Sequence, residues 1–290
     1  MPLVSVLLAV HNDARFLGEA VASVLHQTLD DLELLVVDDA STDETPAVLA
    51  KVSDSRLVVL RNDEQAGLAA SLNRGLEEAN GRFVARLDAD DVALPDRLQR
   101  QVERVRDDEQ TGVVGSAIVD LDERGRRGRT HVMPQGATAL RWHALFSSPF
   151  FHPTVFVDRE VLDAHGLRYD PAFLESEDYD LWTRLFAYVD GDNLPEPLVL
   201  KRVHAGQASQ RRGELQGSFQ RQVALREIQR IAPKIDAELA WRIGARQHAP
   251  VGSRKAFLQL LAAFERRYGR DPAVRKAAFR SLIRLRRRRR

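Results

Sequence analysis

Apolar residues in the first half of the chain form short continuous runs separated by helical patterns. The continuous runs are typical of strands buried on both faces and cover residues 3–10, 32–37, 56–61 and 82–87. Between them, apolar residues recur every three or four positions, as in amphipathic helices, over residues 16–25, 41–52 and 68–79. Near-continuously apolar strands that alternate with helices predict an α/β fold with a mostly parallel sheet covered on both faces.

Helix-starting and helix-stopping residues support this alternation. Ser41 or Thr42 is expected to cap the second helix, with Pro46 in its first turn. Asn80-Gly81 is a strong stop for the third helix, and Pro95 is expected to open a fourth.

The alternation changes after residue 110. Strands are expected over residues 112–122 and 152–158, a Gly- and Arg-rich turn over 123–129, and helices over 160–164 and 176–188. From about residue 214 onward only helical patterns remain. We therefore expect an α/β domain over residues 1–210 and a helical region over 211–290, with a soft boundary near 205–215.

Composition excludes several classes of protein. The 290 residues are 44% hydrophobic and 29% charged, as in ordinary soluble proteins. The chain has no cysteine, which excludes disulfide scaffolds and thiolate metal sites and fits a reducing compartment. The N-terminus lacks a signal-peptide pattern, and no stretch approaches the ~20 apolar residues that cross a bilayer. We expect a cytoplasmic protein that does not span the membrane.

Charge is divided unevenly along the chain. Residues 1–210 carry a balance of −15 and residues 211–290 a balance of +16, so two segments with different tasks are expected. Near the arginine-rich end, Phe279, Leu282 and Ile283 share one helical side among basic residues. Such a helix suits the inner, anionic face of a membrane. The alternatives are packing on the protein's own acidic domain, an oligomer contact, or a disordered end.

Poly-arginine can also bind nucleic acid through phosphates alone. No recognition motif accompanies it, so no specific nucleic-acid partner is expected.

Acidic residues follow two of the expected strands. Asp38-Asp39 end the second, and Asp88 and Asp90 end the fourth; ligands of open parallel sheets bind beyond such carboxyl ends. Side chains two apart on an extended strand point the same way, separated by roughly 6.6 Å of rise. Asp88 and Asp90 could therefore converge on Mg²⁺ or Mn²⁺, which carboxylate oxygens suit and which often carries substrate phosphates. The alternative is a solvated acidic turn.

Four segments resemble glycosyltransferase family 2 in order and spacing: VSVLLAVHNDARFLGEAVASVLHQT, LELLVVDDASTDET, AGLAASLNRGLEEANGRFVARLDADD and ESEDYDLWTRL. The resemblance covers about residues 3–205. It implies the GT-A type of Rossmann-like α/β domain, followed here by the basic helical extension. The implied reaction moves a sugar from a nucleotide-diphosphate donor, with inversion at the anomeric carbon.

The resemblance also implies where the nucleotide binds. Asp39 matches the residue that accepts hydrogen bonds from the base, commonly uracil, and an ionised carboxylate suits an imide N–H because it only accepts. The loop that contains Ala9, His11 and Asn12 is similar to the segment beside the base and ribose. Asp88 matches a ligand of the ribose or of the metal.

Metal ligands are implied in the same way. Asp90 matches the metal-contacting residue of the DxD motif, with Mn²⁺ or Mg²⁺ as the cofactor, and Asp91 either extends the motif or leads the next helix. His204 resembles a histidine that closes the metal site, although Lys201 stands where an aromatic residue is frequent. Imidazole suits Mn²⁺ better than Mg²⁺. A structural histidine is the alternative.

Asp178 matches the general base, placed at a helix start where the helix dipole stabilises an anion. Its alternative, shared with Glu177 and Asp180, is helix capping. Glu177 and His152 are expected on the acceptor side, and for His152 packing before Pro153 is the alternative.

The implied acceptor is a saccharide or lipid-linked hydroxyl in cell-envelope or exopolysaccharide synthesis. Two other functions stay open: a nucleotidyltransferase on a similar sheet, and a catalytically degenerate protein that binds a membrane surface.

Overall fold

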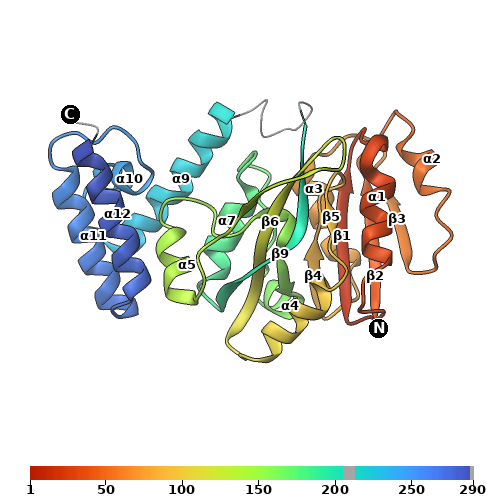
Figure 1. Ribbon diagram of the computed structural model, residues 1–290, viewed down its shortest axis with the longest axis horizontal. Helices are drawn as coiled ribbons and strands as arrows, with labels where there is room; N and C mark the ends of the chain where they lie inside the picture. The colour runs from red at the N-terminus through yellow and green to blue at the C-terminus, as the bar shows by residue number, and fades with distance from the viewer. Residues whose placement is uncertain (205–212, 288–290) are drawn as a thin grey trace.

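The computed structural model describes residues 1–204 and 213–287, so most of the expected boundary at 205–215 lies outside the described residues. Nine strands form one mixed sheet in the order β3-β2-β1-β4-β8-β6-β9-β5, with β7 paired to β6 (Figure 1). Their bounds are β1 Val4–Val10, β2 Leu32–Asp38, β3 Leu57–Arg61, β4 Phe83–Arg86, β5 Val92–Ala93, β6 Thr111–Asp122, β7 Arg127–His131, β8 Phe156–Asp158 and β9 Asp190–Val203.

The sheet has a parallel half and a mixed half. Strands β3, β2, β1 and β4 are parallel neighbours, so their carboxyl ends meet at one edge. Beyond them β8 runs antiparallel to both β4 and β6, while the long strands β6 and β9 pair in parallel. The α/β fold expected from the sequence is confirmed.

Helices cover both faces of the sheet because the buried strands are apolar on both faces. In β1, Val4, Val6 and Leu8 pack toward one face and Leu7 toward the other. The first face is covered by α1 Ala14–Leu25, α2 Thr45–Leu49 and α4 Arg97–Arg106. The second is covered by α3 Leu68–Glu78, α5 Ala137–His143, α6 Arg159–Ala164 and α7 Glu177–Leu185.

The C-terminal region is helical, as expected, and forms the left-hand end of the molecule in Figure 1. It consists of α9 Gly213–Ile231, α10 Ala237–Gly244, α11 Ser253–Tyr268 and α12 Pro272–Arg287. Its hydrophobic cluster includes Trp142 and Leu145 from the sheet domain. The ring of Trp142 lies 5.1 Å from that of Phe264 and 5.7 Å from that of Phe257, so the helices are packed onto α5.

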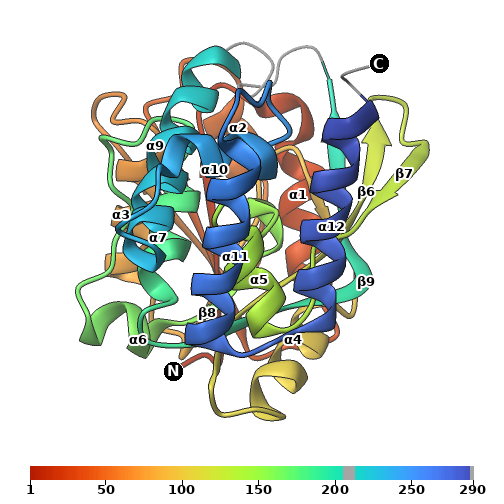
Figure 2. The ribbon, with the colours of Figure 1, turned by 90° about the vertical axis from the view of Figure 1, so that its left-hand side faces the viewer.

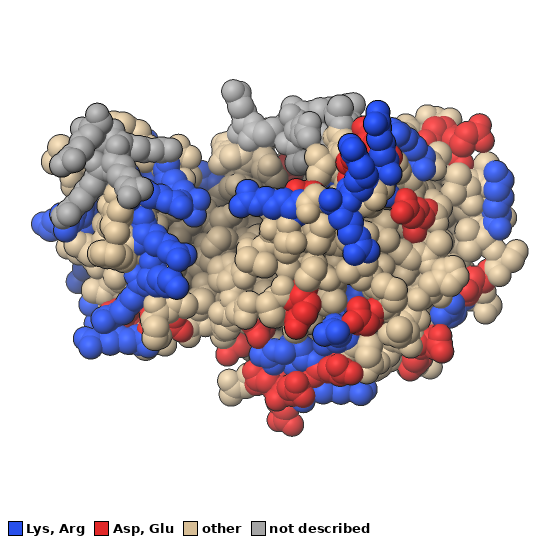
Figure 3. All heavy atoms as spheres, in the orientation of Figure 1, with Lys and Arg blue, Asp and Glu red and all other residues tan. Residues whose placement is uncertain are grey.

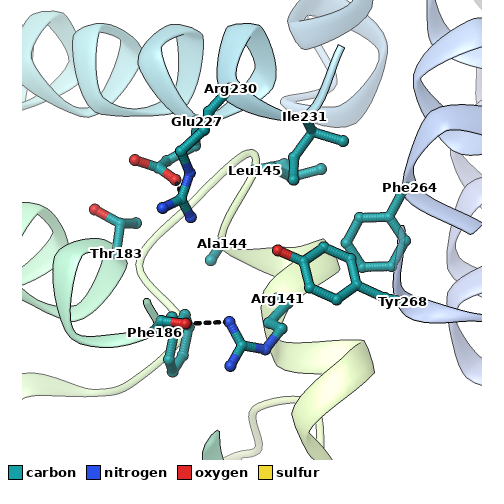
Figure 4. A pocket seen from close by; sticks show the side chains of 10 residues that line it. All are labelled: Arg141, Ala144, Leu145, Thr183, Phe186, Glu227, Arg230, Ile231, Phe264 and Tyr268. Atoms are coloured by element: carbon teal, nitrogen blue, oxygen red, sulfur yellow. Dashed lines mark hydrogen bonds and ion pairs between the residues drawn. The ribbon is translucent and has the colours of Figure 1, made fainter. Parts of the chain in front are cut away.

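Polar contacts also join the two regions. Arg226 of α9 pairs with Asp180 of α7 at 2.5 Å, and Asp180 pairs with Arg184 on its own helix. A small cavity lies beside this junction, between Arg141, Glu227, Tyr268 and their neighbours (Figure 4). Its volume of about 20 Å³ suits a water molecule rather than a ligand.

Several expected elements differ in detail. Helix α2 begins at Thr45 with Glu44 before it, so neither Ser41 nor Thr42 caps it, although Pro46 does lie in its first turn. Helix α4 begins at Arg97, two residues after Pro95. The strand expected over 152–158 is a 3₁₀ turn, His152–Thr154, followed by β8.

Besides the two-residue strand β5, three elements escaped the pattern analysis. The Gly/Arg-rich stretch contains β7 after a short turn, α5 is a helix of only seven residues, and β9 is a 14-residue strand that contains two prolines.

Candidate active site

The acidic residues expected at the strand ends lie at one edge of the sheet. Asp39 follows β2, and Asp88, Asp90 and Asp91 follow β4, with β1 hydrogen-bonded between these two strands. The edge is the upper one in Figure 1, where β1 ends after rising from the N-terminus.

The loops after β1 and β2 are fastened to each other. His11 Nδ1 lies 2.6 Å from the carbonyl oxygen of Asp39, and the Asn12 side-chain oxygen accepts the N–H of Thr42 at 2.7 Å. Asn12 and Ala40 both have a φ of 55°, the left-handed region that costs a residue with a Cβ about 1 kcal/mol. His11 and Asn12 have exposed side chains. With Ala9, they belong to the loop for which the resemblance implied a place beside the nucleotide.

Asp39 is buried and already carries hydrogen bonds from the protein. Its carboxylate accepts the Asn62 amide at 2.6 Å and the backbone N–H groups of Ala66 and Gly67 at 2.8 and 2.9 Å. Burial raises the pKa of Asp39, but these bonds outweigh it, and the net pKa is lowered. The Ser71 side chain also lowers this pKa through a hydrogen bond, so groups of the protein hold the carboxylate ionised.

Asp88, Asp90 and Asp91 converge. Each offers a carboxylate oxygen within 4.8 Å of the others. Asp91 is 1% exposed. Its Oδ1 accepts the backbone N–H of Arg202 at 2.8 Å. Its Oδ2 is buried without a hydrogen-bond partner among the described residues. An orphaned buried carboxylate oxygen beside two further carboxylates is the donor set that a divalent cation fits.

Residues at the end of β9 and just after it contact this acidic group. Arg202 donates its Nε–H to the carbonyl oxygen of Asp90 at 2.8 Å and pairs with Glu19 at 2.5 Å. His204 Nε2 lies 3.0 Å from a carboxylate oxygen of Asp90, and its ring packs 5.5 Å from that of Phe16. The structure therefore brings His204 next to the acidic group.

Burial, and then the crowding of like charges, raises the pKa values of these carboxyl groups. Burial, followed by Asp88, raises the pKa of Asp90. Burial, with Asp88 and Asp90, holds the pKa of Asp91 well above its usual range. Asp13, at the end of the β1 loop, also has a raised pKa, caused by burial and then by Asp90. A cation at this place would relieve the repulsion.

Arg86, the last residue of β4, lies beneath the acidic group. Its side chain is 6% exposed and pairs with Asp88, two residues further on. Nε and Nη1 are buried without a hydrogen-bond partner among the described residues. This buried cation offsets part of the local negative charge and also lowers the pKa of Asp178.

Asp178 and Glu177 begin α7 near the same arginine. The Ser148 hydroxyl donates to Asp178 at 3.2 Å. Burial raises the pKa of Asp178 despite that bond and the nearby Arg86. Glu177 is 6% exposed, and burial followed by the Asp178 charge raises its pKa to about 7. Raised carboxyl pKa values are typical of groups that exchange protons during catalysis.

His152 lies on the same side. Its Nε2 is 3.0 Å from the Tyr169 hydroxyl, and burial, followed by the Arg86 charge, holds the pKa of His152 well below its usual range. This lowering favours the neutral form of the imidazole.

Pattern analysis missed four residues that shape this site: Asp13, Arg86, Ser148 and Arg202. Arg86 left a usable signal, since a basic residue inside an apolar strand and two positions before Asp88 must share the face of that carboxylate. Asp13 also follows a strand end. Ser148 and Arg202 had no local signal because their roles depend on contacts across the fold.

The model of glycosyl transferase family 2 matches residues 5–166, more than half of the chain. This chain belongs to that family. Among the relatives of this family 2 member is EpsE of Bacillus subtilis, a protein named as a glycosyltransferase, which is 33% identical over 69% of this chain and 73% of its own. Another is the Escherichia coli UDP-Glc:alpha-D-GlcNAc-diphosphoundecaprenol beta-1,3-glucosyltransferase WfgD, 32% identical over 62% of this chain and 68% of its own.

Solved structures share the fold of this family 2 chain. The Pyrobaculum calidifontis mannosyltransferase PcManGT, in complex with GDP-Man and Mn²⁺, aligns with a TM-score of 0.61 at 20% identity, covering 98% of this chain and 81% of that one. Staphylococcus aureus TarS in complex with UDP-GlcNAc aligns with a TM-score of 0.65 at 16% identity, covering 98% and 88%. The expected GT-A fold is thereby confirmed.

Within residues 1–204 and 213–287, no helix combines the length and apolarity needed to cross a bilayer.

Proposed function

We propose that this family 2 glycosyltransferase is an inverting, metal-dependent enzyme that uses a nucleotide-diphosphate sugar, with UDP as the nucleotide. The convergence of Asp88, Asp90 and Asp91 at the carboxyl edge of the sheet carries the proposal. That edge is where open α/β sheets bind nucleotides. The nucleotide-sugar complexes of PcManGT and TarS support a donor of this class.

We assign the nucleotide end of the donor to the β1 and β2 loops. Asp39 offers a carboxylate oxygen to the base, while Ala9, His11 and Asn12 line the neighbouring loop. Since the loops are fastened through His11 and Asn12, the base would meet a surface already arranged before binding. Such preorganisation lowers the entropic cost of binding.

Asp88, Asp90 and Asp91 are proposed to hold Mn²⁺ or Mg²⁺, with His204 beside Asp90. All three carboxylates supply hard oxygen ligands, and the orphaned oxygen of Asp91 gains a partner. When bound, the cation would neutralise the diphosphate leaving group. His204 favours Mn²⁺ of the two if its imidazole becomes a ligand.

Asp178 is proposed as the general base. Its carboxylate takes the proton of the acceptor hydroxyl as that oxygen forms a bond to the anomeric carbon. The bond from the anomeric carbon to the diphosphate breaks on the opposite side, which inverts the configuration and releases the nucleoside diphosphate. Ser148 orients the carboxylate. Glu177 and His152 are assigned to the acceptor side.

A lipid-linked saccharide is the proposed acceptor. The diphosphoundecaprenol acceptor in the name of WfgD supports this class. Such an acceptor would place the enzyme on the cytoplasmic, anionic face of the membrane, as a peripheral protein in polysaccharide synthesis. Division into a catalytic domain, 1–210, and a basic helical region, 211–290, fits these two tasks.

Thermal shifts test the donor site directly. UDP, GDP, TDP and CDP would each be added with Mn²⁺, with Mg²⁺ or with EDTA. A ligand at 100 times its Kd stabilises the native state by ~2.7 kcal/mol, which is readily measured. We expect a shift with UDP that requires the metal and disappears in Asp90→Asn.

Asp107→Asn serves as the matched control, because Asp107 is exposed at the end of α4. It should keep the full shift. Absence of a shift with every nucleotide, in folded protein, would contradict the proposal and favour a degenerate binding protein.

A further inference from the structure

Helix α12 has apolar side chains on two opposite sides. Val274 and Ala278 are each 1% exposed and pack into the core of the C-terminal region. Phe279 and Ile283, one turn apart, are 64% and 38% exposed. Leu282 packs partly against the core, so the expectation that it shares a side with Phe279 and Ile283 is wrong. One side of the helix is therefore packed against the C-terminal region, and the other side is exposed to solvent.

Basic side chains flank the exposed pair. Lys276, Arg280 and Arg284 are exposed and follow one another at four-residue spacing, beside the row formed by Phe279 and Ile283. We call these five residues the outer face of α12. An apolar pair bordered by a basic row is typical of helices that lie in the interface of an anionic membrane.

The surroundings of the outer face are basic as well. Residues 251–284 contain nine Lys or Arg and two Asp or Glu. One of those acids, Glu265, is already paired with Arg275 at 2.6 Å. Figure 3 shows basic side chains gathered over this end of the molecule, and Figure 2, which looks onto it, shows α11 and α12 in front. Leu258 of α11 is also 42% exposed at this end.

We propose that the outer face of α12 is a docking surface for an anionic lipid bilayer, with Phe279 and Ile283 inserted among the lipids and the basic row on the headgroups. This deepens the proposed function, on which it rests for the lipid-linked acceptor, by naming the surface that reaches the membrane. The apolar pair distinguishes the face from a nucleic-acid site, because phosphate contacts need no exposed phenylalanine. Its charge opposes a symmetric dimer through the same face, because two basic rows would repel.

Vesicle flotation tests the assignment with the full chain. The vesicles would be phosphatidylcholine alone or phosphatidylcholine with phosphatidylglycerol. The wild type should float only with the anionic vesicles. Phe279→Ser with Ile283→Ser should weaken binding about tenfold because apolar burial is lost. Lys276→Glu with Arg280→Glu should weaken it tenfold or more.

Val58→Ser with Val59→Ser is the matched control. These two valines of β3 are 40% and 45% exposed at the opposite end of the molecule, and their loss should leave flotation unchanged. Equal binding of the α12 variants and the wild type would overturn the proposal, as would flotation that depends only on residues 285–290 in a chain ending at Arg284. Loss of a dimer or of oligonucleotide binding, without loss of flotation, would also overturn it.

UDP thermal shifts on the same variants separate this proposal from the proposed function. Variants that stop floating but keep the nucleotide shift locate the defect at the membrane surface. A wild type that floats but shows no nucleotide shift would contradict the enzymatic function while leaving the docking surface intact.

Discussion

Aspartate side chains follow both β2 and β4, but the surroundings of the carboxylates differ between the two places. After β2, Asp39 accepts three hydrogen bonds from groups of the protein, and its pKa is lowered. After β4, Asp90 and Asp91 are buried beside Asp88, and their pKa values are raised. Ionisation is therefore supported by the fold at the first place and opposed at the second.

The contrast supports a different proposed ligand for each place. A carboxylate held ionised by N–H donors is suited to accept one more N–H, as a nucleobase offers. Crowded carboxylates with an orphaned oxygen are suited to a cation, because only a positive charge offsets their repulsion. Sequence position alone, at a strand end, does not distinguish these two uses.

The largest expected effect is at Asp178, the third acidic place. Asp178→Asn should lower kcat about a thousandfold, since a general base contributes 10²–10⁴ in rate. The nucleotide thermal shift should persist because the donor loops are unchanged. Activity of the wild type should rise with pH as the carboxyl, whose pKa is raised, loses its proton. A small loss of kcat in the variant would exclude Asp178 as the base.

Arg86→Met would remove the buried positive charge that pairs with Asp88 in the acidic group. Breaking a buried pair costs about 3–5 kcal/mol, and partial exposure of Asp88 places the expected loss of unfolding free energy near 3 kcal/mol. Urea denaturation measures it. Arg82→Met, just before the same strand, is the control: the Arg82 side chain is 64% exposed, so its loss should cost less than about 0.5 kcal/mol. Similar losses in both variants would refute the role of Arg86 as the counter-charge.

Glu177→Gln tests how burial of a carboxyl group makes the stability of the fold depend on pH. The folded protein raises the pKa of Glu177 to about 7, so its ionisation destabilises the fold progressively as pH rises from the ordinary value of 4.5 toward 7. The amide removes that cost. The variant should be about 3 kcal/mol more stable than the wild type at pH 8 and equally stable at pH 4. Thermal unfolding at both pH values decides it; a pH-independent difference would contradict the burial argument.

Asp39→Asn is expected to have the smallest effect. An amide offers one acceptor oxygen instead of two, so one of the N–H donors from Ala66 or Gly67 loses its partner, at about 1–2 kcal/mol. The same substitution should also weaken UDP binding, because Asp39 is the proposed partner of the base. Chemical denaturation and the nucleotide shift measure the two effects; unchanged stability would mean that the donors find other partners.

Much of the fold followed from local pattern. The strands β1 to β4 were predictable because each is apolar on both faces and ends at a polar turn. Strand β9 was not, because Pro195 and Pro197 argue against a strand; it tolerates them where its register with β6 is irregular, at Ala117. Helix α5 was too short for a clear period, and packing of Trp142 against the C-terminal helices stabilises it.

The site was predictable where it depends on strand ends and unpredictable where it depends on contacts between distant segments. Asp39, Asp88 and Asp90 follow strands whose order brings them to one edge. Arg202 reaches Asp90 and Asp91 from more than a hundred positions away, and its role requires the pairing of β9 with β5 and β6. The roles themselves remain predictions for the experiments above.

The ion pair between Asp180 and Arg226 has a structural consequence. Asp180 lies two residues beyond Asp178 on α7, and Arg226 belongs to the C-terminal helices that include α12. The helix that carries the proposed base and the region that carries α12 are therefore joined by a direct polar contact as well as by apolar packing.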